Sequence, residues 1–314
     1  MLDLISFKNE FISLCRHELC ETGPADMEIE ERTVTKAQRG MLNGLLFRKE
    51  GLACAPTFYV EDFYKAYKDG SSIAELSHEV IDTAVRSMGM AGILAKNSFA
   101  LLGDTDNLRV RLLNKGRNKD YLKGIPYREL GCGFVFIAEI GRGDYGAVIT
   151  DALMDEYDMN VDELFDTAIK NTAERFPAVL QDLGDSVISD PEECRNLFDQ
   201  TSGKAPADAG PAFVLTNSRF FWGAGALFYP GLIDRIHELL GGDFYILPSS
   251  VHELILIALD DQDPKQLADL VRSANRSVVK DSEVLADDLY ICESGKVSRV
   301  SYGGVIPACG SYVC

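Results

Sequence analysis

The sequence has 314 residues, of which 46 % are hydrophobic and 25 % are charged, values typical of a globular chain with a sizeable core. Its 31 Lys and Arg residues face 49 Asp and Glu residues, which gives a formal net charge of −18. This composition excludes a disordered or fibrous protein. The negative field also makes nucleic acid and anionic membrane surfaces poor partners, so we expect neither.

Met1–Cys20 is the segment that comes closest to a targeting signal. Charged residues interrupt it throughout, and no basic region precedes an apolar stretch of signal-peptide length. Its apolar residues recur at helical steps, which predicts an amphipathic helix. No run of about 18 apolar residues, the length that spans a bilayer, occurs in the sequence. We therefore expect a cytoplasmic protein.

Eight cysteines are spread along the sequence, and no two of them form a C-x-x-C motif. Because ligand pairs of structural zinc sites usually stand about two to four residues apart, this spacing favours reduced, mostly buried thiols over a metal site. Each histidine precedes a glutamate, but none completes H-E-x-x-H. We expect no metal and no cofactor. Cys309 and Cys314 are the thiols that exposure could leave reactive.

One pattern recurs along the chain: two short apolar runs, separated by a turn that contains glycine, precede a stretch with helical spacing. The predicted hairpins span residues 42–60, 134–150, 212–229, 244–259 and 288–300. The predicted helices after them span residues 62–67, 73–87, 161–176, 232–240 and 264–274. Because short connections join antiparallel neighbours, we predict an α+β fold, in which repeated hairpin–helix units form a mainly antiparallel sheet with helices packed on it.

The clearest change in composition lies at residues 199–211, where Gln, Ser, Gly, Lys, Ala and Pro replace the apolar periodicity. We predict a linker or a long surface loop for this segment. It would separate an N-terminal α+β subdomain, residues 1–198, from a C-terminal α+β subdomain, residues 212–314. We expect the two subdomains to pack together rather than to fold independently.

Residues Gly141–Gly146 spell the motif G-x-G-x-x-G after an apolar strand. Such a motif can bring backbone N–H groups close to phosphate oxygens, but a dinucleotide site also needs a helix that begins within the glycines. Residues 147–150 instead predict a second strand, and the lysine and catalytic motifs of a protein kinase are missing from the sequence. We therefore expect a hairpin turn, whose positive-φ positions explain the glycines.

The most distinctive stretch places Ser249, Ser250, His252 and Glu253 after an apolar strand that ends at a proline. These residues are the catalytic candidates, because a hydroxyl, an imidazole and a carboxylate could serve nucleophilic catalysis if the imidazole reached the hydroxyl. No G-x-S-x-G elbow exposes either serine. Hydroxyl groups after a proline more often fix a turn between strands, so a turn with a core histidine is the favoured interpretation.

Residues 109–128 form a strongly basic stretch within this acidic chain. The ligand-binding candidates in it are Arg109, Arg111, Lys115, Arg117 and Lys119. Their charges could bind a phosphate or an acid, or this surface could dock on an acidic partner. The favoured interpretation is that these residues form a strand and a loop exposed to solvent. Trp222, the single tryptophan, is expected in the core or at a subunit contact rather than at a ligand.

The strings Leu215-Thr216-Asn217, Gly223-Ala224 and Ile246–Glu253 resemble the DUF5688 family, a set of uncharacterised proteins from gut clostridia. Similar stretches extend from about Glu28 to Tyr290, which is most of the chain. The resemblance implies a bacterial protein of unknown function. It implies no activity, cofactor or catalytic residue, because none is established for that family.

These observations favour a cytoplasmic protein that binds a small ligand or a protein partner and performs no chemistry. Each catalytic motif lacks the neighbouring residues or elements that its chemistry needs. The alternative is a hydrolase-type enzyme that uses the serine, histidine and glutamate cluster at residues 249–253. A phosphate or acid site built on the basic stretch is a third possibility.

Overall fold

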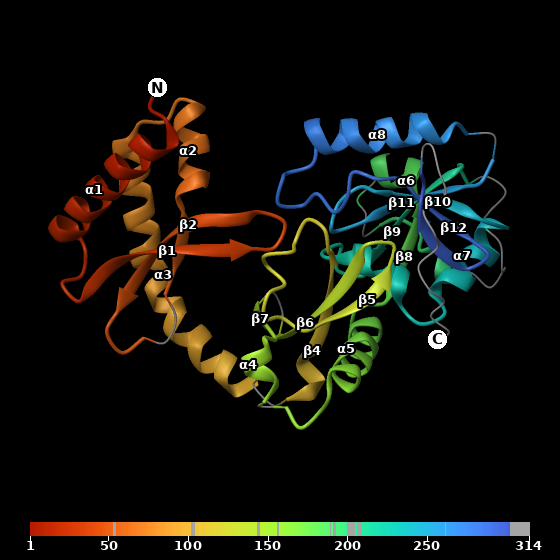
Figure 1. Ribbon diagram of the computed structural model, residues 1–314, viewed down its shortest axis with the longest axis horizontal. Coiled ribbons are helices and arrows are strands. Elements are labelled where there is room, and N and C mark those ends of the chain that lie inside the picture. The colour runs from red at the N-terminus through yellow and green to blue at the C-terminus, as the bar shows by residue number, and fades with distance from the viewer. Residues whose placement is uncertain are drawn as a thin grey trace. The chain divides into compact units, whose positions relative to one another are not determined.

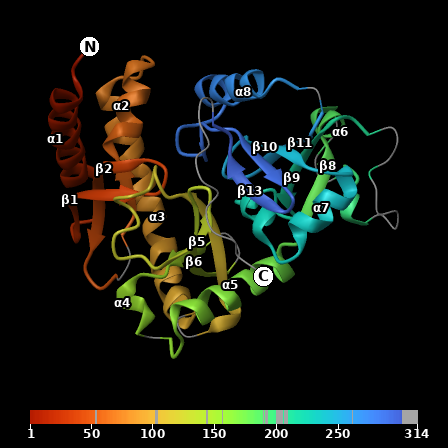
Figure 2. The ribbon, with the colours of Figure 1, turned by 45° about the vertical axis from the view of Figure 1, so that its right-hand side comes forward.

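The computed structural model describes residues 1–301 apart from 53–54, 102–103, 143–144, 156, 189, 191–192, 200–204, 206–208 and 261. The chain divides into two compact units, Met1–Leu102 and Gly103–Cys314, whose elements are labelled in two views (Figure 1, Figure 2). Every strand pairing within the described ranges is antiparallel. Helices pack on the sheets, so the α+β class predicted from the sequence is confirmed.

The first unit packs its helices against a sheet of order β1-β2-β3. Its elements are α1 (Leu4–Thr22), β1 (Met27–Lys36), β2 (Gly40–Lys49), β3 (Thr57–Tyr59), α2 (Val60–Lys68) and α3 (Ile73–Leu101). The core joins Phe7 and Phe11 of α1 to Leu45 and Phe47 of β2 and to Val80 of α3. The predicted helices are confirmed. The sequence pattern does not predict β1, because charged residues and threonine occupy most of that strand.

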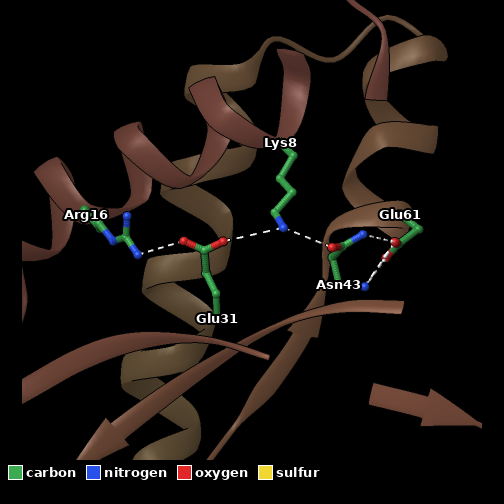
Figure 3. Close-up of polar contacts among 5 residues, drawn as sticks. All are labelled: Lys8, Arg16, Glu31, Asn43 and Glu61. Atoms are coloured by element: carbon green, nitrogen blue, oxygen red, sulfur yellow. Dashed lines mark hydrogen bonds and ion pairs between the residues drawn. The ribbon is translucent and has the colours of Figure 1, made fainter. Parts of the chain in front are cut away.

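A series of polar contacts ties α1 to the sheet of the first unit (Figure 3). The carboxylate of Glu31 on β1 accepts a hydrogen bond from Arg16 at 2.8 Å and lies 3.5 Å from the ammonium group of Lys8. Lys8 also donates to Asn43 of β2 at 2.9 Å, and the side chain of Asn43 donates to Glu61 of α2 at 2.7 Å. Two cations and two carboxylates therefore balance one another in this network.

The smaller sheet of the second unit has the order β4-β6-β5, and β7 pairs with the C-terminal half of β6. The elements of this part are η1 (Thr105–Asn107), β4 (Leu108–Asn114), β5 (Tyr127–Gly131), β6 (Phe134–Arg142), β7 (Tyr145–Val148), α4 (Asp151–Met154) and α5 (Val161–Arg175). Helix α5 covers the open edge of β4, where the hydroxyl of Thr172 accepts from the backbone N–H of Val110 at 2.9 Å. The predicted hairpin over residues 134–150 and the helix after it are confirmed.

Helix α5 begins with a capping box. The side chain of Asn160 accepts from the backbone N–H of Glu163 at 3.0 Å, and the Glu163 carboxylate accepts from the backbone N–H of Asn160 at 2.9 Å. Because both bonds satisfy donors that a helix start leaves unpaired, Asn160→Ala is expected to lower the free energy of unfolding by about 1 kcal/mol. Urea denaturation measures this change. Glu174→Ala on the exposed face of α5 is the control, and equal midpoints for the two variants would contradict the prediction.

The larger sheet of the second unit has the order β13-β12-β10-β11-β9-β8. The elements of this part are β8 (Ala178–Asp182), α6 (Leu183–Ile188), η2 (Leu197–Asp199), β9 (Ala212–Asn217), η3 (Gly223–Phe228), α7 (Leu232–Leu240), β10 (Phe244–Pro248), β11 (Leu254–Ala258), α8 (Pro264–Ser277), β12 (Tyr290–Glu293) and β13 (Lys296–Arg299). Helix α8 covers one face of the sheet, where Leu267 and Val271 belong to one cluster with Tyr245 and Leu247 of β10 (Figure 2). The hairpins β10–β11 and β12–β13 were both predicted and are confirmed.

The hairpin predicted over residues 212–229 is wrong, because Gly223–Phe228 forms a 3₁₀ helix instead of a second strand. Strand β9 pairs with β8 and β11 instead. The small residues of this stretch allow the helix to pack closely against the two sheets, and a Cβ atom on Gly225 would lie 3.1 Å from the ring of Phe136. A short apolar run does not distinguish a strand from a tightly packed helical turn.

Residues 199–211 lie between η2 and β9, and most of them are outside the described ranges. The strands on either side of this segment, β8 and β9, are neighbours in one sheet. The backbone N–H of Gly210 donates to Asp182 of β8 at 2.5 Å. The division into compact units lies between Leu102 and Gly103. The segment expected to be a linker or long loop therefore connects two strands of the second unit.

Candidate functional site

A half-open pocket of the second unit, which we call the arginine pocket, lies between the smaller sheet, the end of β9 and η3. It is lined by Arg109, Val110, Arg111, Phe136, Glu139, Thr172, Phe176, Asn217, Arg219, Phe221, Trp222, Gly225 and Tyr229. About 40 Å³ of it is open to the centre of a water molecule, so the pocket admits only a small group.

The floor of the arginine pocket holds a partly buried ion triad. Strand alternation places Arg109 and Arg111 on the same face of β4, and Glu139 of β6 lies directly across from Arg109 in the register. The Glu139 carboxylate lies 3.2 Å from the guanidinium group of Arg109 and 2.6 Å from that of Arg111. The side chains of Arg109, Arg111 and Glu139 are 13 %, 21 % and 5 % exposed. Burial lowers the pKa of Arg109 and the nearby Glu139 opposes that shift, but a guanidinium group stays charged in proteins.

Gly146 of β7 leaves the space that the side chain of Arg109 occupies. A Cβ atom at this position would lie 2.6 Å from a terminal nitrogen of Arg109 and 3.1 Å from the carbonyl oxygen of Ile140. Gly146 pairs with Gly141 across the β6–β7 hairpin, as expected for a G-x-G-x-x-G segment that forms a turn. Gly143 and Asp144, at the centre of the motif, lie outside the described residues. The last glycine of the motif thus makes room for the side chain of Arg109 in the site.

Trp222 orients the guanidinium group of Arg111. The guanidinium carbon of Arg111 lies 3.9 Å from the ring centroid of Trp222, a cation–π contact that orients the planar group. The Nε atom of Arg111 is buried, and no described residue is its hydrogen-bond partner. Trp222 is half-buried and lines the pocket, so it does not lie in the core, which was one of the two positions expected from the sequence.

The turn between β9 and η3 brings Arg219, Phe221 and Trp222 to the pocket. Phe220 and Trp222 have φ angles of 53° and 54°, in the left-handed region that costs a non-glycine residue about 1–2 kcal/mol. The buried side chain of Asn217 holds the turn, because it accepts from the backbone N–H of Arg219 at 3.0 Å and donates to the carbonyl group of Phe221 at 3.1 Å. Backbone strain of this kind is concentrated at functional sites.

The catalytic candidates lie in the turn between β10 and β11. The hydroxyl of Ser249 donates to the Glu253 carboxylate at 3.2 Å, and the hydroxyl of Ser250 accepts from the backbone N–H of His252 at 3.0 Å. The contacts described for these two hydroxyl groups do not include the imidazole ring. Both hydroxyls therefore have the partners that a serine has when it fixes a turn.

The imidazole of His252 supports the turn that carries Trp222. Its Nδ1 atom accepts from the backbone N–H of Trp222 at 3.1 Å, and its Nε2 atom lies 4.0 Å from the carboxylate of Glu283. Burial lowers the pKa of His252, while Glu283 and Glu253 oppose that shift and Lys280 adds to it. The neutral ring is the form that can accept the bond from Trp222, because both ring nitrogens of a charged imidazole are donors.

Since the folded state lowers the pKa of His252 from its ordinary value of 6.5, the unfolded chain binds more protons between the two pKa values. The contribution of His252 to stability is therefore present above pH 6.5 and is lost as the pH falls towards the folded-state pKa. His252→Asn keeps an acceptor near the place of Nδ1 and does not titrate. We expect this variant to lose less stability than the wild type between pH 7 and pH 5, by urea denaturation. His17→Asn, which replaces an exposed histidine, is the control and should lose as much stability as the wild type. An equally large loss in His252→Asn would contradict the prediction.

The structure brings two of the five basic ligand candidates into the arginine pocket, Arg109 and Arg111. The other three lie on the turn after β4. Lys115 pairs with Glu129, Arg117 lies 3.1 Å from Asp287, and Lys119 is exposed. These three cations do not line the pocket in the described part of the chain.

The charged residues that line the arginine pocket in the described part of the chain are three arginines and one glutamate. No group of three or more His, Cys, Asp and Glu side chains in the described ranges could hold a metal ion. Guanidinium groups gathered in one pocket attract anions.

A second pocket lies in the first unit. It is lined by Lys8, Glu31, Arg32, Thr33, Asn43, Gly44 and Leu45, and about 80 Å³ of it is open to the centre of a water molecule. Lys8 lies beside Glu31 (Figure 3), and Arg32 lies 3.0 Å from Glu30. Each of these two cations therefore has a carboxylate beside it.

Sequence reasoning missed three residues of the arginine pocket: Glu139, Asn217 and Arg219. A signal for Glu139 exists, because a single acid within the apolar run 134–140 must be paired if that strand is buried. Nothing in the local sequence pattern of Asn217 or of Arg219 indicates a pocket. The contact between the turn after β9 and β4 is a long-range one, which local spacing does not reveal.

The second unit is thus an α+β fold with a pocket lined by three arginines. The family of unknown function DUF5688 matches residues 8–294, and the chain belongs to this family, as the resemblance noted in its sequence implied. Comparison with curated proteins and with solved structures gave no match. No helix within the described residues is long and apolar enough to cross a membrane.

Proposed function

We propose that the second unit binds a small ligand through an oxyanion group held in the arginine pocket, and that it performs no chemistry on that ligand. The observation that carries this proposal is that three guanidinium groups line one pocket, in which the buried Nε atom of Arg111 has no hydrogen-bond partner among the described residues. Guanidinium groups match the geometry of phosphate, sulfate and carboxylate oxygens. The proposal retains the cytoplasmic location and the small-molecule partner expected from the sequence.

Burial strengthens the attraction that the arginine pocket exerts on an anion. A charge pair at 4 Å gains about 4 kcal/mol at the effective dielectric near a protein surface, against about 1 kcal/mol in bulk water. Arg109 and Arg111 are mostly buried, whereas Lys119 stands in solvent on the turn after β4. The same basic stretch of sequence therefore contains a strong candidate site and an exposed charge that serves as its control.

Isothermal titration calorimetry with sodium sulfate and sodium phosphate, in sodium chloride at constant ionic strength, tests this proposal. We expect saturable binding of one anion per chain to the wild type. Arg219→Gln removes one of the three guanidinium groups that line the pocket and is expected to weaken binding at least tenfold, whereas Lys119→Gln should leave the affinity unchanged. A wild type that shows no saturable binding, or equal losses in the two variants, would contradict the proposal.

The hydrolase alternative predicts a nucleophilic serine at residues 249–253. The contacts of the two hydroxyl groups with Glu253 and with the backbone support a turn instead. A fluorophosphonate probe, which forms a covalent bond with activated serines, is expected to leave Ser249 and Ser250 unlabelled in peptide mass spectrometry. Labelling of either serine would favour the enzyme over the binding protein.

A further inference from the structure

The turn that carries Trp222 packs against the turn between β10 and β11. The hydroxyl of Thr216, near the end of β9, donates to the carbonyl group of His252 at 2.8 Å. The backbone N–H of Ala224 donates to the carbonyl group of Val251 at 3.3 Å. The ring of His252 lies beside that of Trp222, with centroids 5.7 Å apart, and accepts from the Trp222 backbone N–H at 3.1 Å. The imidazole therefore supports the turn at a residue whose φ angle is in the left-handed region.

Trp222 connects His252 to the guanidinium group of Arg111. The carbon atom of that group lies 3.9 Å from the centroid of the Trp222 ring, so a movement of the Trp222 backbone would change the orientation of the guanidinium group. Arg219 belongs to the same turn, and both arginines line the pocket. His252 is not among the described residues that line it. The imidazole would thus act on a bound anion by positioning other side chains.

The imidazole can hold the N–H of Trp222 only while it is neutral. In the neutral ring Nδ1 is the acceptor and Nε2 carries the proton, whereas both nitrogens of the charged ring are donors. A proton on Nδ1 would bring two donors together, and the turn or the ring would have to move. Burial lowers the pKa of the ring, the carboxylates of Glu283 and Glu253 raise it, and the cations of Lys280 and Arg111 lower it.

We propose that His252 is a positioning residue of the arginine pocket, and that a proton on its imidazole weakens the binding of an oxyanion. This inference rests on the proposed function and adds a pH dependence to it. Because coupling between two binding events is reciprocal, a bound oxyanion must then make the imidazole harder to protonate. Charge attraction alone predicts the opposite sign, since a nearby anion favours the charged form of a histidine.

Nuclear magnetic resonance titration of the labelled histidine side chains, with and without saturating sodium sulfate at constant ionic strength, tests this sign. We expect sulfate to lower the pKa of His252 in the wild type. Calorimetry should show sulfate binding that is about five- to tenfold weaker at pH 5 than at pH 8, at the lower end of what coupled sites show. Sulfate itself remains a dianion over this range. A pKa of His252 that rises or stays unchanged in a protein that binds sulfate would overturn the inference and leave the proposed function standing.

Two variants separate the positioning role from a general loss of structure. His252→Asn keeps an acceptor near the place of Nδ1 and does not titrate, so its sulfate affinity should match the wild type at pH 8 and fall less towards pH 5. His252→Ala has no such acceptor and is expected to bind sulfate at least fivefold more weakly at pH 8. The control is His237→Asn, which replaces the other histidine of the second unit and should keep the wild-type pH profile.

Equal pH profiles for the wild type and His252→Asn would overturn the inference, as would equal affinities of the Asn and Ala variants at pH 8. If the wild type binds no sulfate at either pH, the proposed function fails as well.

Discussion

Gly223→Ala is expected to lower the free energy of unfolding by about 3 kcal/mol or more, at the upper end of what overpacking costs. A Cβ atom on Gly223 would lie 2.6 Å from the backbone nitrogen of Asn217 and 2.7 Å from the carbonyl oxygen of His252. Both are backbone atoms that cannot rotate away, so β9 or the turn after β10 would have to shift. The same shift would displace the turn that carries Arg219, so we also expect anion binding to be lost.

Gly231→Ala is the matched control for this substitution. Gly231 has a φ angle of 71°, but no atom lies within 4 Å of the position that its Cβ would take. The alanine there costs about 1 kcal/mol for the left-handed backbone alone. Urea denaturation of the two variants distinguishes the stability lost through a steric clash from the stability lost through a left-handed backbone conformation. Equal losses of stability would show that the packing of Gly223 against β9 has no energetic role.

Glu139→Ala is expected to lower the free energy of unfolding by about 3–5 kcal/mol, because it leaves two partly buried guanidinium groups without their shared carboxylate. Glu129→Ala breaks an exposed ion pair with Lys115 and is expected to cost less than about 1 kcal/mol. Thermal and urea denaturation measure both changes. A Glu139→Ala variant that is as stable as Glu129→Ala would contradict the description of the triad as buried.

Sulfate is expected to restore part of the stability that Glu139→Ala loses. The anion replaces the missing carboxylate, and binding to the folded state alone stabilises it by mass action. The rise in melting temperature on adding sulfate should therefore be larger for Glu139→Ala than for the wild type. An equal rise in both proteins would place the bound sulfate away from the triad.

The sequence pattern predicts the elements whose signals are local. Helix α5 was expected over residues 161–176 and extends over Val161–Arg175, and the β10–β11 hairpin lies where the apolar runs flank the Pro248 turn. Strand β1 was not predicted, because charged residues and threonine at its exposed positions obscure the alternation of apolar and polar residues. The second half of the hairpin predicted over residues 212–229 is a 3₁₀ helix, because a short apolar run fits either structure and only its packing against β9 and β6 decides between them.

Only part of the candidate site could be predicted from the sequence. Arg109 and Arg111 were candidates because they belong to a basic stretch in an acidic chain. Their partner Glu139 lies on another strand, and Arg219 and Trp222 come from a turn more than 100 residues further along the chain. Which cations gather in a pocket depends on these long-range contacts, whereas Lys115, Arg117 and Lys119 share the same local composition and remain on the surface.

A crystal of the wild-type protein soaked in selenate would locate the bound anion directly, because selenate is a tetrahedral dianion whose selenium atom scatters X-rays anomalously. We expect the strongest selenium peak within hydrogen-bond distance of the guanidinium groups of Arg111 and Arg219, and we expect Arg219→Gln crystals to lack it. Selenium peaks found only elsewhere on the surface, with the arginine pocket filled by water, would contradict the assignment of this pocket as an oxyanion site.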